Sequence, residues 1–544
     1  MSTALRPAGF RQPSVFRAVE GALEAVARRR RLAVLLIGLL PIAVRVAQLP
    51  WAPAPEPVQH DEFSYLLAAD TFASGRLTNP PHALPWHFEA FHIIQRPTYA
   101  SKYPPAQGLI LALGQYLTGQ PFAGVLVSVG LMCGAICWML QGWVSPGWAL
   151  LGGFLGAAKY SIHHYWIDSY WGGAMAGLGG ALVLGALPRL LRRPRPGAGI
   201  VLGLGLAMLA NSRPYEGLLL CFPIAVVLGR VYFKDSKPVK ASDVRKACIP
   251  VIVILVITTG LSAFYNYRVT GKPLTTPYTV HERAYMPVPP FLWQHLPPFP
   301  DYHNPTMRKF GLQLVEAFNQ QRSWHSVGRR LLEIWELPHG LDFSEEIREN
   351  PAVIWFPLNA AGLLAALWML RSRRMRVATI CFALVTAGML ATSWYLEHYS
   401  APIAALRILL WVEFLRLLAA QRHVPLAVWI GRCVPVAVAA YLAIYLVRTP
   451  LRIPSITGIQ IDRPRITAEL ERLPGKQLVI VRYQRNHDPN IEWVYNRADI
   501  DGAKIVWARY LTPPENLALL QYYSGRTVWL LDPDRVPVRP IPFR

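Results

Sequence analysis

The stretch His60-Asp61-Glu62-Phe63-Ser64-Tyr65-Leu66-Leu67-Ala68-Ala69-Asp70 comes soon after the first strongly apolar segment of the chain. Phe63, Leu66 and Leu67 recur at helical spacing, which predicts a short amphipathic helix with one apolar face. Asp61 and Glu62 fall in its first turn, where the partial positive charge of a helix N-terminus favours carboxylates. Acidic residues are common at helix starts, so their position alone favours a structural role over a functional one.

The composition around this stretch is that of a membrane protein. The 544 residues are 53% hydrophobic and only 16% charged, and several apolar runs approach the ~20 residues that span a bilayer as a helix. We therefore expect an all-α polytopic membrane protein with about eleven transmembrane helices and one re-entrant or short helix. The lipid bilayer is its first expected partner.

The net charge of +23 does not indicate a nucleic-acid partner. Much of this charge lies in short clusters beside apolar segments, as expected for the cytoplasmic ends of membrane spans, and no nucleic-acid-binding motif is present. A basic amphipathic helix is predicted at residues 15–30 on the cytoplasmic membrane face. The basic clusters are residues 28–31, 189–195, 234–246 and 371–376.

Counting the spans exposes one irregular segment. Residues 50–103 and 161–171 are both expected outside, so an even number of crossings must separate them. Three apolar pieces lie between them, at residues 104–117, 121–140 and 148–158. We expect one of them, the short 148–158 piece, to be re-entrant or half-length and to line a protein-enclosed cavity.

The expected domains follow from the same pattern. Residues 1–31 form a cytoplasmic N-terminus, and residues 32–447 form the transmembrane domain, with large outside loops at 50–103 and 265–350. Residues 448–544 have the composition of a small soluble α/β domain on the outer face, expected to cover or dock. Its predicted strands are residues 478–481, 504–508 and 527–531, and its predicted helices are residues 466–473 and 514–523.

The unusual polar clusters all fall on the predicted outer face, each at a span end. Ionisable groups at such depth are costly and usually face a protected cavity, so four such clusters favour a site over interfacial anchoring. For most Trp and Tyr residues we favour the interfacial belt. The clusters are Asp61-Glu62 with residues 79–102, then residues 163–170, 211–216 and 397–399.

Transfer from a lipid phosphate is the chemistry that suits these groups. A carboxylate takes the proton from an acceptor hydroxyl or amine, and a cation such as Arg96, Lys102 or Arg213 holds the leaving phosphate. A structural alternative for Arg213 is a salt bridge to Glu216, three residues on. Cofactor use stays open: oxygen donors from Asp61, Glu62 and Asp168 would suit Mg²⁺ or Mn²⁺.

The order of these motifs resembles the GT-C membrane glycosyltransferases, in particular their protein O-mannosyltransferase and aminoarabinose transferase branches. The resemblance covers about residues 32–420. One departure concerns Lys102: relatives often carry a Lys directly before the Pro-Pro pair, where this chain has Tyr103. The matching motifs are Arg45, Asp61-Glu62-Phe63-Ser64-Tyr65, Tyr103-Pro104-Pro105, Asp168, Ser212-Arg213-Pro214-Tyr215-Glu216-Gly217, and His398-Tyr399 with Pro402.

The resemblance implies an inverting transfer of a sugar from a polyprenyl-phosphate donor to an acceptor at the outer, periplasmic-type face of a bacterial inner membrane. Asp61 would be the catalytic base, and Glu62 would help to position the acceptor, an unspecified glycan, lipid or protein. The expected substrate-binding residues are Arg96, Lys102, Tyr103, Asp168, Arg213, Glu216, His398 and Tyr399.

Two other functions remain open at this level. A transporter or flippase of a lipid-linked sugar would use the same basic and aromatic groups, but transporters more often show internal repeats and mid-membrane charges. A non-catalytic membrane scaffold would account for the C-terminal module and leave the polar clusters without a role. The sequence favours the glycosyltransferase.

Overall fold

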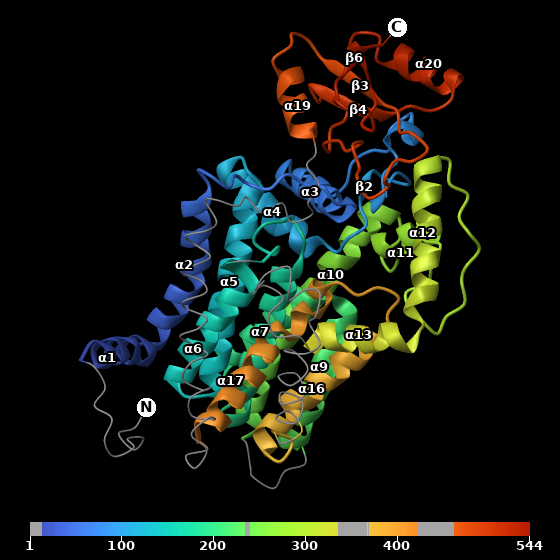
Figure 1. The fold of residues 1–544 in the computed structure, drawn as a ribbon. Helices are drawn as coiled ribbons and strands as arrows, with labels where there is room; N and C mark the ends of the chain where they lie inside the picture. The colour runs from blue at the N-terminus through green and yellow to red at the C-terminus, as the bar shows by residue number, and fades with distance from the viewer. Residues whose placement is uncertain are drawn as a thin grey trace.

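Apolar helices build the body of the molecule, and a small α/β module stands at one end of it (Figure 1). The computed structural model describes residues 14–162, 164–233, 240–335, 367, 369–420 and 462–543. The N-terminal helix α1 (Ser14–Arg28) is present where the basic amphipathic helix was predicted. The module lies at the same end as α3 (His60–Ala73), the helix that carries Asp61 (Figure 1).

Five helices of the described chain are long and apolar enough to cross a membrane, so the protein is an integral membrane protein. The central two, α5 and α7, are largely buried among other helices. In the most apolar part of α10 only 6% is buried, so most of its side chains lie on the surface of the bundle. The five are α2 (Arg30–Gln48), α5 (Phe122–Trp143), α7 (Gly173–Arg192), α9 (Pro214–Phe233) and α10 (Ala241–Thr270).

The remaining helices of the bundle are shorter than the ~20 residues that a straight crossing needs. Helix α6 has 12 residues and continues into a π-helical turn, η2 (Ala158–Ile162). It contains most of residues 148–158, which were predicted to form a short or re-entrant piece. The count of about eleven spans stays a prediction, because residues 424–447 and most of 352–370 lie outside the described residues. The shorter helices are α4 (Pro105–Thr118), α6 (Pro146–Ala157), α8 (Pro196–Ala210), α16 (Arg373–Ala391) and α17 (Ala404–Ala420).

The segment predicted as the second outside loop begins with the end of a helix. Helix α10 runs on to Thr270, where Gly271 caps it in the left-handed conformation. The loop also has helices of its own, which the sequence analysis did not predict: α11 (Pro277–Tyr285), α12 (Pro305–Gln321) and α13 (Trp324–Trp335).

Glycine allows one close approach that matters for the site. A Cβ atom on Gly180 of α7 would collide with the backbone carbonyl of Pro402. Its absence lets the short 3₁₀ helix η3 (Glu397–Ile403) pack directly on α7. His398 is thereby held against the bundle rather than displayed on a free loop.

Helix α3 is not amphipathic, contrary to the prediction. Almost every residue from His60 to Thr71 is buried, including the polar Glu62 and Ser64. The reason is that α4 packs on one side and the C-terminal module covers the other. Phe63 stacks on Tyr495 of the module with ring centroids 4.5 Å apart.

The module is a four-stranded sheet in the order β4-β3-β5-β6, with helices α19 (Arg463–Glu471) and α20 (Pro513–Tyr522). The three predicted strands are present as the parallel β3 (Gln477–Val481), β4 (Ile505–Arg509) and β5 (Thr527–Leu531). The antiparallel β6 (Ile541–Pro542) was not predicted.

One hydrophobic core joins the module to the first outside loop. Loop residues from η1 (Pro85–Phe88) and the hairpin of β1 (Ile93–Ile94) and β2 (Ala100–Ser101) pack with β3, β4 and α20. The module is therefore fixed on the loop that follows α3, the helix that carries Asp61. The core contains Leu67, Phe88, Ala90, Ile93 and Tyr99 on one side and Leu478, Ile480, Val506, Ala508 and Leu519 on the other.

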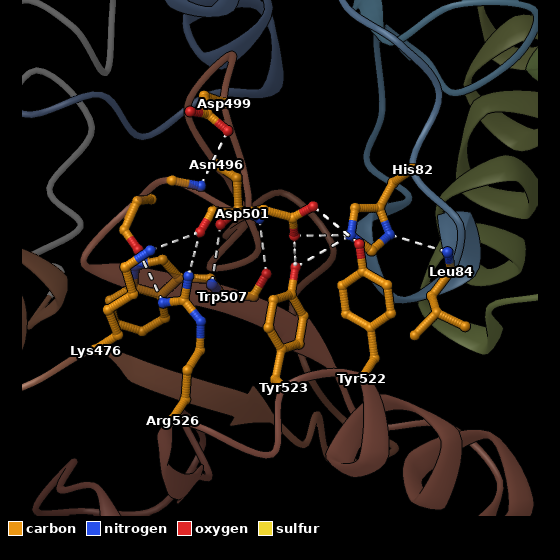
Figure 2. Close-up of polar contacts among 12 residues, drawn as sticks. His82, Leu84, Lys476, Asn496, Asp499, Asp501, Trp507, Tyr522, Tyr523 and Arg526 are labelled. Carbon is orange, nitrogen blue, oxygen red and sulfur yellow. Dashed lines mark hydrogen bonds and ion pairs between the residues drawn. The ribbon is translucent and has the colours of Figure 1, made fainter.

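Polar contacts secure the same junction (Figure 2). The ring of His82, from the loop, lies with Nε2 3.2 Å from Asp501 Oδ1, while its Nδ1 accepts the N–H of Leu84 at 2.9 Å. Tyr523 donates its hydroxyl to the same carboxylate. Arg526 donates to the backbone carbonyl of Asp501 at 2.6 Å, which pins the turn that presents Asp501 to the loop.

Candidate functional site

Asp61 lies at the start of α3, and each of its two carboxylate oxygens has a polar side chain as a neighbour. The hydroxyl of Tyr103 donates to Oδ1, and Nε2 of His92 lies 3.7 Å from Oδ2. Burial disfavours the charged form, but His92, the hydrogen bond from Tyr103 and the ammonium of Lys102 outweigh it and lower the pKa of Asp61 to about 2. The carboxylate is thus ionised at neutral pH and able to receive a proton.

Lys102 points into the same region despite standing one position earlier than in relatives. Its Nζ lies 3.9 Å from Glu282 Oε1 and sits over the rings of Tyr103 and Tyr278, 5.2 and 5.1 Å from their centroids. Burial lowers the pKa of Lys102, and the carboxylates of Glu282 and Asp61 oppose this effect. Aromatic faces and carboxylates are what a buried ammonium needs to stay charged.

Arg213 adds a second cation. Its guanidinium lies 4.0 Å from the ring centroid of Tyr399, in a cation–π contact. The charge of Glu216, one helical turn along, also acts on Arg213. Arg213 and Asp61 both affect the ionisation of Tyr399, so the two side chains face a common region.

His398 is fixed by a two-way contact with Tyr165. The Tyr165 hydroxyl accepts the backbone N–H of His398 at 3.0 Å and lies 3.1 Å from its Nδ1. When that hydroxyl donates to Nδ1, the ring proton is on Nε2. Burial lowers the pKa of His398 well below its usual value, so the ring is neutral at pH 7.

Glu62 holds backbone groups. Its Oε2 accepts the N–H groups of Val58 and Gln59 at 2.9 and 3.1 Å, and its Oε1 accepts that of Tyr170 at 3.1 Å. Burial raises the pKa of Glu62, although these three bonds oppose the rise. The side chain therefore ties the start of α3 to the segment after η2, and its place in the site is that of an anchor.

Asp168 and Arg96 do not meet Asp61. Arg45 donates to Asp168 Oδ1 from Nε at 3.0 Å and from Nη2 at 2.8 Å, and also binds the carbonyls of Ala52 and Pro53. This pair ties α2 to the same segment as Glu62 does. Arg96 is exposed, and within the described chain we find no polar contact between it and the residues around Asp61.

The three carboxylates considered for a metal ion do not converge. Asp61, Glu62 and Asp168 each bind different partners, and the described part of the chain holds no group of three His, Cys, Asp or Glu side chains arranged around a common metal position.

Sequence reasoning missed the contribution of the second outside loop. His281 and Glu282 of α11 reach His92 and Lys102: the N–H of His92 donates to His281 Nε2 at 3.1 Å. The adjacent His-Glu pair in a short aromatic helix was visible in the sequence. Nothing local indicated that it lies beside a loop that is 189 residues earlier.

No family model and no curated protein sequence matches the chain. Among solved structures it is similar to the archaeal oligosaccharyltransferase AglB from Archaeoglobus fulgidus, solved with an inhibitory peptide and a dolichol-phosphate. That match has a TM-score of 0.49 and 10% identity, and it covers 93% of this chain and 70% of AglB. Similarity to ArnT from Cupriavidus metallidurans extends over 95% of this chain and 93% of that one, with a TM-score of 0.46 and 14% identity.

A second ArnT structure, bound to undecaprenyl phosphate, matches with a TM-score of 0.46 and 13% identity. AglB and ArnT are glycosyltransferases of the GT-C type, the class that the sequence motifs resemble. At these identities and TM-scores, the function proposed below depends on the residues of the site.

Proposed function

We propose that this protein is an integral-membrane glycosyltransferase that moves a sugar from a polyprenyl-phosphate donor to an acceptor at the outer face of the membrane, with inversion. The observation that carries the proposal is that Tyr103 contacts both an ionised carboxylate, Asp61, and the buried ammonium of Lys102, with Arg213 as a further cation over Tyr399. A base beside phosphate-binding cations is what displacement of a lipid phosphate by a hydroxyl or amine requires.

The reaction balances with these groups. Asp61 takes the proton from the acceptor as the acceptor oxygen or nitrogen forms its bond to the anomeric carbon. The bond from that carbon to the phosphate oxygen breaks, and its electron pair stays on the phosphate, where Lys102 and Arg213 compensate the added charge. Tyr103 orients Asp61 by its hydrogen bond to Oδ1. Glu62 and the Arg45–Asp168 pair hold the surrounding backbone.

The donor-phosphate role of Lys102 is tested by replacing it with Met, which keeps the length of the side chain and removes the charge. We expect the KM for the lipid donor to rise about tenfold or more, because a buried charge-assisted contact to the phosphate is lost. Arg96→Met is the matched control: Arg96 is exposed, and its loss should leave the donor KM unchanged. Equal effects of the two substitutions would contradict the assignment of Lys102.

The membrane orientation is proposed from the basic clusters: N-terminus in the cytoplasm, C-terminal module outside. Single-cysteine variants test it. Ser524 is exposed on the module, and Gly197, at the start of α8 beside a basic cluster, has open space around its Cβ position. An impermeant thiol reagent should label Ser524→Cys but not Gly197→Cys in intact cells, with the parent protein as background. The reverse pattern would place the module in the cytoplasm.

The function itself is tested by the fate of the donor. Membranes containing the protein are incubated with a radiolabelled polyprenyl-phosphate sugar and cell extract, and compared with membranes that lack it. Label that leaves the lipid fraction supports transfer. Label that stays on the lipid and changes leaflet would identify a transporter instead.

A further inference from the structure

His92 has an unusual backbone. Its φ of 63° makes it the one non-glycine residue with positive φ in the part of the chain that the structure describes. A side chain in this left-handed region is strained, and such strain persists only where the surroundings hold it. The backbone of His92, one residue before β1, is therefore held in this conformation by its neighbours, and the conformation sets the direction of the side chain.

Three different elements hold the backbone of His92. Its N–H donates to Nε2 of His281 on α11 at 3.1 Å. Its carbonyl accepts the hydroxyl of Ser64 on α3 at 2.6 Å and the N–H of Lys102, next to β2, at 3.1 Å. Both polar backbone groups are thus paired, and His281 and Ser64 are themselves fully buried. The conformation is fixed from all three sides.

The result is that the ring faces Asp61. Nε2 lies 3.7 Å from Oδ2, while Nδ1 is buried without a hydrogen-bond partner. Because only Nε2 faces an acceptor, the ring proton is placed there. Burial, with Lys102 as a lesser cause, lowers the pKa of His92 well below its usual value, so the ring is neutral. The titratable and charged groups around it are His60 and Asp61 on α3, Lys102 and Tyr103 after β2, and His281 on α11.

We propose that His92 is a positioning residue for Asp61: its ring, with Nε2 3.7 Å from Oδ2, stands against one carboxylate oxygen while the Tyr103 hydroxyl donates to the other, so that the ionised carboxylate keeps one orientation toward the acceptor. This inference rests on the proposed function. His92 stays neutral throughout, and the proton that leaves the acceptor goes to Asp61. Lys102 and Arg213, the cations proposed for the donor phosphate, keep their charge when the ring of His92 is replaced, so donor binding should not depend on that ring.

Two amide substitutions separate this role from a merely structural one. Asn tolerates the left-handed backbone better than other residues, but its amide reaches only as far as Nδ1 of His. Gln reaches the position of Nε2 and offers an N–H there. We expect His92→Asn to lower kcat about tenfold with the donor KM unchanged, as for the loss of a polar contact to a charged group. His92→Gln should restore most of kcat.

The pH profile supplies the second readout. A polar N–H directed at a carboxylate favours its charged form, so removing the Nε2–H should raise the pKa of Asp61. The acid limb of kcat should therefore move to higher pH in His92→Asn and return toward the wild-type position in His92→Gln. His303→Asn is the control, since His303 is a half-exposed ring that pairs with Glu515 away from Asp61. It should leave kcat and the profile unchanged.

Thermal unfolding of each purified variant verifies folding, and His92→Gly, which accepts the backbone conformation without strain, replaces the Asn variant if that does not fold. The proposal is overturned if His92→Asn keeps wild-type kcat and pH profile. Equal losses in the Asn and Gln variants, or an effect confined to the donor KM, overturn it as well. Transfer that survives Asp61→Asn removes the proposed function; loss in Asp61→Asn with no effect of His92→Asn removes this inference alone.

Discussion

Replacing Asp61 by Asn is expected to lower sugar transfer about a thousandfold, the range found when a general base is removed. The amide keeps the shape of the side chain and cannot take the acceptor proton. The loss should appear in kcat, since the donor phosphate is held by Lys102 and Arg213. Initial rates of label transfer in membranes, at matched amounts of protein, measure it.

Asp70→Asn is the matched control for this substitution. Asp70 lies on the same helix, and its carboxylate accepts the side-chain amide of Gln115 at 2.9 Å and the N–H of Ala498 at 2.8 Å. Both are structural contacts, so this variant should keep kcat within about twofold, apart from any loss of folded protein. Full transfer by Asp61→Asn, or equal losses in both variants, would show that Asp61 is not the base.

The second large effect concerns stability. Arg509, at the end of β4, is 1% exposed and forms an ion pair with Glu492, which is 3% exposed. Its Nε also donates to the carbonyl of Glu89 in the first outside loop. Arg509→Met should destabilise the docked module by about 3–5 kcal/mol, because the charge of Glu492 is left buried without its partner. Denaturant unfolding or protease sensitivity of the module measures the loss.

An exposed ion pair of the same module is the comparison. Arg465 is 46% exposed and pairs with Asp462 and Glu469, so Arg465→Met should cost no more than about 1 kcal/mol. The double variant Arg509→Met, Glu492→Met should recover much of the stability, since no unpaired charge remains. A single Arg509→Met variant as stable as wild type would mean that the buried pair does not hold the module.

The helices and strands that follow from local patterns of apolar and charged residues could be predicted from the sequence. The start of α3, the apolar helices, and strands β3, β4 and β5 follow from periodicity and from acidic residues in a first turn. The proximity of Asp61, Lys102 and Tyr103 followed from a family resemblance. These features need only residues that are near one another in the chain or motifs that recur in order.

The rest depends on contacts between distant segments. Helix α3 appeared amphipathic because nothing near it in the sequence indicates that α4 will pack on one side while the module, with Tyr495 stacked on Phe63, covers the other. The family resemblance assigned Glu62 to the acceptor, and its bond to the backbone of Tyr170, 108 residues away, could not be read from the local sequence. Nothing in the sequence predicted a role for His92, because that role depends on a backbone conformation that the distant His281 helps to hold.

The anomeric configuration of the product tests the central claim most directly. A polyprenyl-phosphate sugar of known configuration is incubated with wild-type and Asp61→Asn membranes and cell extract, and the labelled product is digested with anomer-specific glycosidases. A single displacement assisted by one base predicts an inverted product that forms only when Asp61 is intact. A retained configuration would contradict this account, because it requires a covalent sugar–enzyme intermediate and a nucleophile in place of a base.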